Sequence, residues 1–202
     1  MQLIARFYDV ESGAVEFDGR DVRSIARQTL RSQMAFVLQD PFLFEANVYE
    51  NIRYGKLDAT DEEVVEAAKM ANAHDFIMKL PDGYKTVLSA DGGEISQGQK
   101  QLLSIARALV ADPVILLLDE ATSSIDTVTE MKIQEALEVL MEGRTSFVIA
   151  HRLNTVRNAD VVLVMQQGTV IESGRQDELV ARGGVYAGML RAGKDIDALL
   201  DR

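Results

Sequence analysis

The sequence contains no cysteine, which excludes disulfide bonds and metal sites built on thiolates. It also contains no apolar run near the roughly 18 residues that a membrane-spanning helix requires. Basic residues are scarce, because 21 Lys and Arg face 32 Asp and Glu and leave a net charge of −11. Nucleic-acid binding draws mainly on Lys and Arg contacts to phosphate, so this balance argues against a nucleic-acid partner.

A phosphate-binding loop of the form G-x-x-x-x-G-K-[ST] is also absent from the 202 residues. What is present is ordinary in bulk, since 47% of the residues are hydrophobic and 26% are charged. This composition and length fit a globular chain with a sizeable core, organised as one domain or one domain with a subdomain. Function must therefore be inferred from local motifs.

Strand and helix patterns alternate along the chain. Apolar segments at 34–38, 114–118 and 146–150 predict buried strands, and the stretches 61–79 and 96–110 predict helices. Strands that alternate with helices indicate an α/β fold, and strands that are apolar on both faces indicate a parallel sheet covered by helices.

The same patterns divide the chain into parts. Residues 1–41 and 111–202 carry the strands and predict the α/β core. Residues 42–110 are mostly helical and predict an inserted subdomain. Residues 1–7 look like the second half of a helix without its capped beginning.

An acid pair, Asp119-Glu120, directly follows the apolar strand 114–118. It therefore emerges at the carboxyl end of a strand, where open α/β sheets bind ligands. A carboxylate at Asp119 can hold Mg²⁺, and Glu120 can polarise a water for attack on a phosphate. A lone Asp-Glu pair is more often a solvated turn, but the apolar run before it and residues 121–126 after it favour a site.

Two further predicted strands also end in candidate residues. Gln39 follows the segment 34–38, and its amide oxygen can ligate Mg²⁺ or hold a water, although a glutamine in a turn is usually only solvated. His151 follows the segment 146–150, and its imidazole can contact a γ-phosphate, although a single histidine is more often structural.

A serine-led loop opens the predicted helix 96–110 and presents backbone N–H groups that can bind an anion. It consists of Ser96, Gln97, Gly98 and Gln99. Farther upstream, Phe42-Leu43-Phe44 places three large apolar residues in a loop, which form either a core patch or a docking surface.

This ordered set of motifs resembles the nucleotide-binding domain of ATP-binding cassette (ABC) transporters. The resemblance covers nearly the whole chain, and segments 37–44 and 50–55 are similar to the exporter branch, such as bacterial multidrug or lipid exporters. The matching motifs are the Q-loop at Gln39, the signature loop at Ile95-Ser96-Gln97-Gly98-Gln99, Walker B ending at Asp119, the catalytic glutamate at Glu120, the D-loop ending at Asp126 and the switch histidine at His151.

The resemblance implies a P-loop NTPase-like fold and an ATPase whose cassettes work in pairs. A second cassette, identical or different, would close head to tail with this one around two ATP molecules. The signature loop of one cassette would contact the γ-phosphate held by the other. The residues implied in that contact are Ser96, Gln97, Gly98 and Gln99.

Within one cassette the resemblance assigns the remaining roles. Glu120 and His151 would be catalytic and would act on the ATP bound by their own cassette. Gln39 and Asp119 would ligate Mg²⁺, and Gln39 and Asp126 would complete the nucleotide contacts.

The resemblance also implies a membrane partner. A fused or associated transmembrane domain would contact the region Phe42–Phe44, and ATP hydrolysis would power export of a substrate. The cassette would then lie at the cytoplasmic face of the cell membrane, with no nucleic-acid partner.

The missing phosphate-binding loop departs from the family pattern. In this family the loop precedes a segment like Met1–Phe7, so we expect Met1 to be internal to a longer chain and the first core strands to lie upstream. An in-frame stop codon directly before Met1 would contradict this expectation. The chain alone should bind ATP poorly, because each lost charge-assisted hydrogen bond is worth roughly 1.5–3 kcal/mol.

Two other functions remain open from the sequence. The chain can be a non-catalytic partner cassette that lends its Ser96 loop to another subunit, although a site without catalysis need not keep Glu120 and His151. It can also be a soluble ABC-type ATPase of translation or DNA repair, but the net charge of −11 and the segment from Phe42 argue against this.

Overall fold

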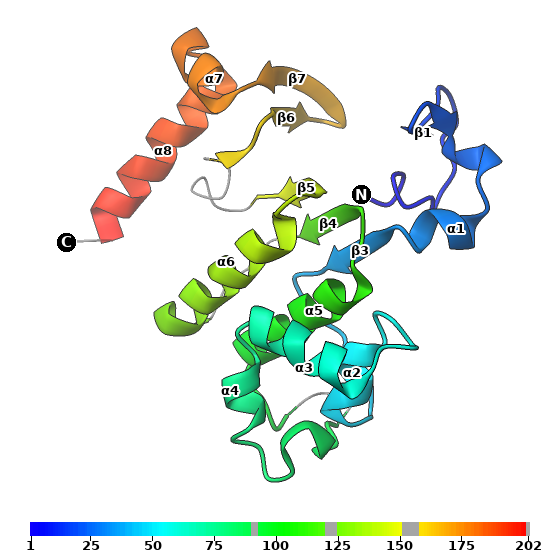
Figure 1. Cartoon of the computed structure of the whole chain (residues 1–202). Coiled ribbons are helices and arrows are strands. Elements are labelled where there is room, and N and C mark those ends of the chain that lie inside the picture. The colour runs from blue at the N-terminus through cyan, green and yellow to red at the C-terminus, as the bar shows by residue number, and fades with distance from the viewer. Residues whose placement is uncertain (90–92, 120–124, 151–157, 201–202) are drawn as a thin grey trace. The chain divides into compact units, whose positions relative to one another are not determined.

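The computed structural model describes residues 1–89, 93–119, 125–150 and 158–200, and of 193–200 only the backbone. The chain forms two compact units, Met1–Ile149 and Ala150–Arg202 (Figure 1). The first unit contains, in chain order, β1 (Glu16–Phe17), β2 (Arg20–Asp21), the 3-10 helix η1 (Val22–Ser24), α1 (Arg27–Arg31), β3 (Met34–Val37), α2 (Val48–Arg53), α3 (Asp61–Met70), α4 (His74–Ile77), the 3-10 helix η2 (Gly83–Lys85), α5 (Gln97–Ala111), β4 (Ile115–Asp119), α6 (Thr127–Met141) and β5 (Thr145–Ile149). The second contains β6 (Val162–Gln166), β7 (Thr169–Gly174), α7 (Gln176–Arg182) and α8 (Val185–Leu200).

The first unit is organised around a parallel sheet in the order β3-β4-β5. In its register, Leu118 of β4 lies opposite Val37 of β3 and Val148 of β5. The consecutive residues Leu116 and Leu117 point to opposite faces of the sheet, and both are fully buried. Burial on both faces is typical of a parallel strand covered by helices, so the predicted α/β fold with a parallel sheet is confirmed.

Helices α2 to α5 lie between β3 and β4 in the chain and gather below the three strands in the view of Figure 1. Helix α5 is the centre of this group and packs against α2, α3, α6 and β3. Its inner face is almost completely buried, and so are the alanines of α3 that lie in the same core. The residues concerned are Ala67, Ala68, Leu102, Leu103, Ile105 and Ala106.

The long helix predicted over 61–79 is wrong, because the structure divides it into α3 and α4. Helix α3 begins with a capping box between Thr60 and Glu63, but Asn72 adopts a left-handed conformation with φ 57°. The N–H of Ala73 then bonds to the Ala68 carbonyl at 2.8 Å, which closes the helix end. The Asn72 side chain also donates to the Lys132 carbonyl of α6, a contact that anchors this turn.

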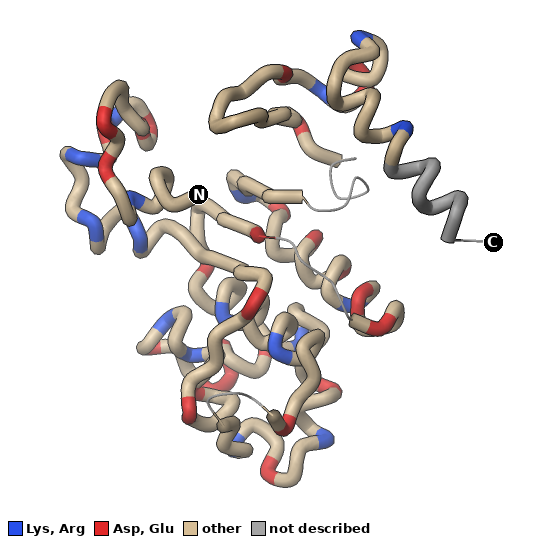
Figure 2. Tube along the Cα trace, turned by 180° about the vertical axis from the view of Figure 1, so that it is seen from behind, with Lys and Arg blue, Asp and Glu red and all other residues tan. Residues whose placement is uncertain are grey.

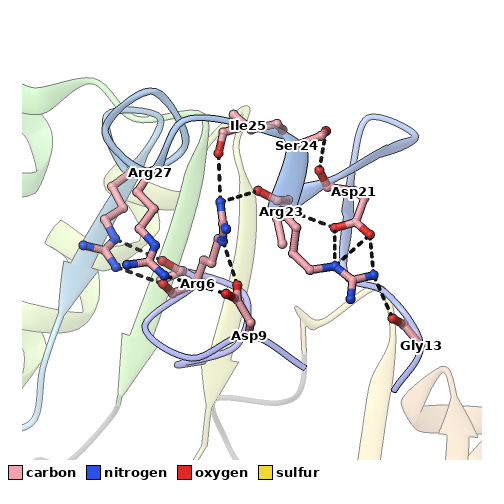
Figure 3. A network of polar contacts seen from close by, with 11 residues as sticks. Arg6, Asp9, Gly13, Asp21, Arg23, Ser24, Ile25 and Arg27 are labelled. Atoms are coloured by element: carbon pink, nitrogen blue, oxygen red, sulfur yellow. Dashed lines mark hydrogen bonds and ion pairs between the residues drawn. The ribbon is translucent and has the colours of Figure 1, made fainter. Parts of the chain in front are cut away.

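The helix expected at residues 1–7 is also wrong, because this segment forms turns. Arg31 donates to the backbone carbonyls of Ala5 and Arg6, which a continuing helix would use for its own hydrogen bonds. Arg6 itself has a positive φ of 53° and donates to the Ile25 carbonyl and to Asp9 (Figure 3). Arg31, which comes later in the chain, therefore fixes the backbone of this segment.

Strand β5 differs from its prediction in burial. Phe147, Val148 and Ile149 are about two-fifths exposed, at 40%, 37% and 43%, whereas the sequence predicted a buried strand. Within the described sheet, β5 pairs with β4 alone and forms an edge, so fewer neighbours cover its side chains.

The second unit consists of a hairpin and two helices. A turn at Gln167-Gly168, with φ of 48° and 78°, joins β6 to β7. Leu179 of α7 is fully buried against Val162 and Tyr186. None of the described helices is long and apolar enough to cross a membrane.

The buried position of Leu116 generates a stability prediction. Leu116→Ala should lower the free energy of unfolding by about 2–5 kcal/mol, because it leaves a cavity in the middle strand of the sheet. Leu57→Ala makes the same change at a side chain that is 79% exposed, and should alter stability by no more than about 0.5 kcal/mol. Urea unfolding measures both variants, and equal losses would contradict the described core.

Candidate functional site

The carboxyl ends of the parallel strands bring two of the predicted site residues to one edge of the sheet. Asp119 is the last residue of β4 and lies opposite Ile149 of β5. Gln39 comes two residues after Val37, the last residue of β3, which lies opposite Leu118. The Gln39 side chain is exposed and Asp119 is half-buried, so oxygen atoms are accessible at this edge.

The two predicted catalytic residues lie outside the described residues. Glu120 directly follows Asp119, and His151 comes two residues after the end of β5. Their roles stay predictions.

The signature loop forms the capped beginning of α5. Ser96 is the N-cap, and its Oγ accepts a hydrogen bond from the Gln99 N–H at 3.3 Å. The Gln99 side chain in return accepts from the Ser96 N–H at 2.9 Å. Gln97 is exposed at the first helical position, next to N–H groups that carry the positive end of the helix dipole. This end of α5 can therefore bind an anion, as the sequence predicts.

Gly98 has a packing role that the sequence analysis missed. It is buried, and a Cβ atom added there would overlap the γ-methyl group of Thr129 in α6 and lie 3.2 Å from a methyl carbon of Ile125. The beginnings of α5 and α6 therefore touch at this glycine. Its missing side chain sets how closely the signature loop approaches the D-loop helix.

Asp126 caps α6, and its carboxylate accepts from the Thr129 N–H at 3.0 Å. This backbone hydrogen bond is the main reason why the pKa of the Asp126 carboxyl is lowered from its ordinary value. Asp126 is thus held as an anion beside the contact between Gly98 and Thr129.

The residues at the sheet edge fit Mg²⁺ together with a nucleotide. Amide and carboxylate oxygens, as at Gln39 and Asp119, are hard ligands of the kind that Mg²⁺ prefers. Over the described part of the chain, no group of three or more His, Asp or Glu could hold a metal ion.

A surface pocket of about 310 Å³ offers a different candidate site. It is lined by Tyr49, Asp61, Glu62, Val65, Glu66 and Lys69. Its carboxylates would repel a triphosphate, and the lysine is already bonded to Glu66 at 2.6 Å. The pocket is therefore a poor nucleotide site. Figure 2 likewise shows acidic residues in the helical part of the chain, where they belong to α2, α3 and α4.

A comparison with known proteins identifies the family of this chain. A family model described as "ABC transporter" matches residues 1–123. The chain belongs to the ABC transporter family. It is an ABC transporter ATP-binding domain close to exporter-type proteins, so the resemblance read from the sequence is confirmed. Proteins of this family generally bind ATP and Mg²⁺.

Several relatives of this ABC domain are named for transport. It is 60% identical to an uncharacterized ABC transporter ATP-binding protein of Bacillus subtilis, over 92% of this chain and 31% of that protein. It is 52% identical to a fatty acid ABC transporter ATP-binding/permease protein of Mycobacterium bovis, over 95% of this chain and 30% of that protein. It is 50% identical to an ATP-dependent lipid A-core flippase of Syntrophus aciditrophicus, over 92% of this chain and 31% of that protein. The chain thus spans about a third of the length of these relatives.

A solved structure shares the fold. A bacterial Atm1-family ABC exporter with ATP bound superposes with a TM-score of 0.87 at 41% sequence identity. The match covers 95% of this chain and 33% of the exporter chain.

The close approach at Gly98 generates a double-variant prediction. Gly98→Ala should lower the free energy of unfolding by about 1–3 kcal/mol, because the new methyl group overlaps the side chain of Thr129. Thr129→Ser removes that γ-methyl group, so the double variant should recover much of the loss, with a coupling energy of about 0.5–3 kcal/mol.

Gly188→Ala is the matched control, because nothing lies within 4 Å of a Cβ added at Gly188 in α8. It should leave stability unchanged or raise it by up to about 1 kcal/mol. Urea unfolding of the four variants supplies the measurement. Strictly additive effects of Gly98→Ala and Thr129→Ser would disprove the contact.

Proposed function

We propose that this chain is the ATP-hydrolysing cassette of a membrane exporter. The observation that supports this most is the common sheet edge of Gln39 and Asp119, in a chain that belongs to the ABC transporter family. In this proposal residues 42–110 are the inserted helical subdomain, and residues 1–41 and 111–202 are the α/β core.

Residues at the sheet edge would hold the nucleotide and prepare the water that attacks it. Gln39 and Asp119 would ligate Mg²⁺, which when bound neutralises charge on the phosphates. Glu120 would accept a proton from the attacking water, and His151 would contact the γ-phosphate. Asp126 is held as an anion at the start of α6 and would complete this side of the site.

A second cassette would supply the other side of the site. The exposed Gln97 and the N–H groups at the beginning of α5 are suited to the γ-phosphate of an ATP bound by the partner cassette. Ser96, Gly98 and Gln99 would hold this tip in shape through the capping box and the contact with α6.

The loop at Phe42–Phe44 supports a membrane partner. Leu43 is buried in the core, whereas Phe42 is 62% exposed, so the loop is anchored and yet presents an aromatic ring. A fused or associated transmembrane domain would dock there and place the cassette at the cytoplasmic face of the membrane. Relatives named for fatty acid transport and a lipid A-core flippase support a lipid-like cargo.

The exposed tip of α5 also supports a second function. A cassette that does not hydrolyse ATP itself would offer Gln97 and the N–H groups of this tip to an ATP held by another subunit.

The decisive experiment is made in the transporter formed by this cassette and its membrane domain. Glu120→Gln should abolish ATP turnover and leave ATP binding intact, because the amide cannot accept the proton of the water. Glu142→Gln, the same change at the end of α6, should turn over ATP like the unaltered protein. Turnover that survives Glu120→Gln would show that Glu120 is not the base that activates the water.

A further inference from the structure

We propose that Arg107 is a positioning residue that couples an exposed aromatic cluster to the signature end of α5. The aromatic cluster consists of Phe42, Phe44 and Tyr54. The inference rests on the proposed function, in which this cluster receives the membrane domain and the beginning of α5 meets the nucleotide.

The Arg107 guanidinium binds backbone oxygens of two segments that lie far from it in sequence. Its Nε donates to the Asn51 carbonyl at 2.8 Å and its Nη1 to the Phe42 carbonyl at 2.9 Å. Its Nη2 donates to Asn51 Oδ1 at 3.2 Å. One side chain of α5 therefore holds both α2 and the loop that follows β3.

The same guanidinium lies against the aromatic cluster. Its central carbon is 5.5 Å from the ring centroid of Phe44 and 5.7 Å from that of Tyr54. The two rings are themselves 4.4 Å apart, and Phe42 meets Phe44 edge to face at 5.1 Å. Because Phe42 and Tyr54 are 62% and 57% exposed, a partner that presses on these rings would press on Arg107.

Asn51 and Gly55 make this attachment stiff. Asn51 is 1% exposed, accepts from the Phe44 N–H at 2.9 Å and donates to the Phe44 carbonyl at 3.0 Å. A Cβ atom added at Gly55 would overlap the carbonyl oxygen of Arg107, so the end of α2 rests directly on the backbone of α5. Helices α2 and α5 thus meet directly at Gly55, and the Asn51 and Arg107 side chains join the aromatic cluster to both helices.

Helix α5 connects this attachment to the signature loop. Arg107 lies ten residues after Gln97, which corresponds to about 15 Å along a continuous helix. At the other end of α5, Gly98 contacts Thr129 of α6. A shift of Arg107 along α5 would therefore move the contact between the beginnings of α5 and α6. The proposed coupling therefore runs along one continuous helix, from Arg107 to the signature loop.

The charge of Arg107 indicates a role other than filling space in the core. The Arg107 guanidinium donates to uncharged oxygens of Phe42 and Asn51, and burial lowers its pKa. An apolar residue would pack there without this desolvation penalty. The forked guanidinium instead fixes the directions of three oxygen acceptors, which a flexible side chain would not do.

Hydrogen exchange on the 202-residue chain tests the coupling. Arg107→Lys keeps the charge but loses the fork, and should speed exchange of the Phe44 N–H by about tenfold. It should also speed exchange of the Lys100 N–H, which donates to the Ser96 carbonyl, by about threefold or more. Arg107→Gln should produce larger changes at the same two amides.

Arg144→Lys is the matched control. Arg144 also donates to backbone carbonyls, those of Pro113 and Leu140, but it lies at the end of α6 and does not contact the aromatic cluster. Its substitution should leave the Phe44 and Lys100 amides unchanged. An effect of Arg107→Lys on Phe44 alone would make Arg107 a local anchor and overturn the coupling, and no effect on either amide would overturn the positioning role.

A second readout separates this inference from the proposed function. The transporter's ATPase rate is measured in phosphatidylethanolamine–phosphatidylglycerol vesicles and in detergent. In Arg107→Lys the ratio of the vesicle rate to the detergent rate should fall about fivefold or more, while the detergent rate stays near that of the unaltered protein. An unaltered transporter without ATPase activity would refute the proposed function and leave the exchange result standing. An unchanged ratio in the variant would refute the coupling alone.

Discussion

The pairing of β4 with both β3 and β5 is the constraint on which the proposed site depends. Leu118 lies between Val37 and Val148, and the buried leucines on both faces of β4 hold this register. A slip by one residue would exchange the faces of these side chains and move Asp119 relative to Gln39. Hydrophobic burial in the middle of β4 thus fixes the position of Asp119 at its end.

Two glycines determine how the helices meet around this sheet. Gly98 lets the beginning of α5 touch α6, and Gly55 lets the end of α2 touch the Arg107 carbonyl of α5. At neither position can a side chain be added without displacing a neighbour. Helix α5 is therefore fixed near both of its ends, one beside the proposed nucleotide contact and the other beside the aromatic cluster.

Features that depend on neighbouring residues could be predicted from the sequence. The parallel strands followed from apolar runs such as 114–118, and the start of α5 followed from the serine-led loop at Ser96. The shared edge of Gln39 and Asp119 followed from the same strands, because parallel strands end on the same side.

Features set by distant residues could not be predicted in this way. The helix break at Asn72 is anchored on Lys132, and the turn at Arg6 is held by Arg31. Arg107 and Asn51 are also far apart in the chain, so neither was recognised as a site residue. One feature of the sequence does indicate Arg107, because it is an arginine within the mostly apolar stretch 96–110.

Cysteine cross-linking tests the register of the sheet most directly, since the chain has no cysteine of its own. Leu38 and Asp119 each follow the register pair Val37 and Leu118, so Leu38→Cys with Asp119→Cys should form a disulfide on mild oxidation. Leu38→Cys with Ile115→Cys moves the partner about 13 Å along β4 and should not cross-link. Equal cross-linking of the two pairs, or cross-linking of the second alone, would contradict the common edge of Gln39 and Asp119.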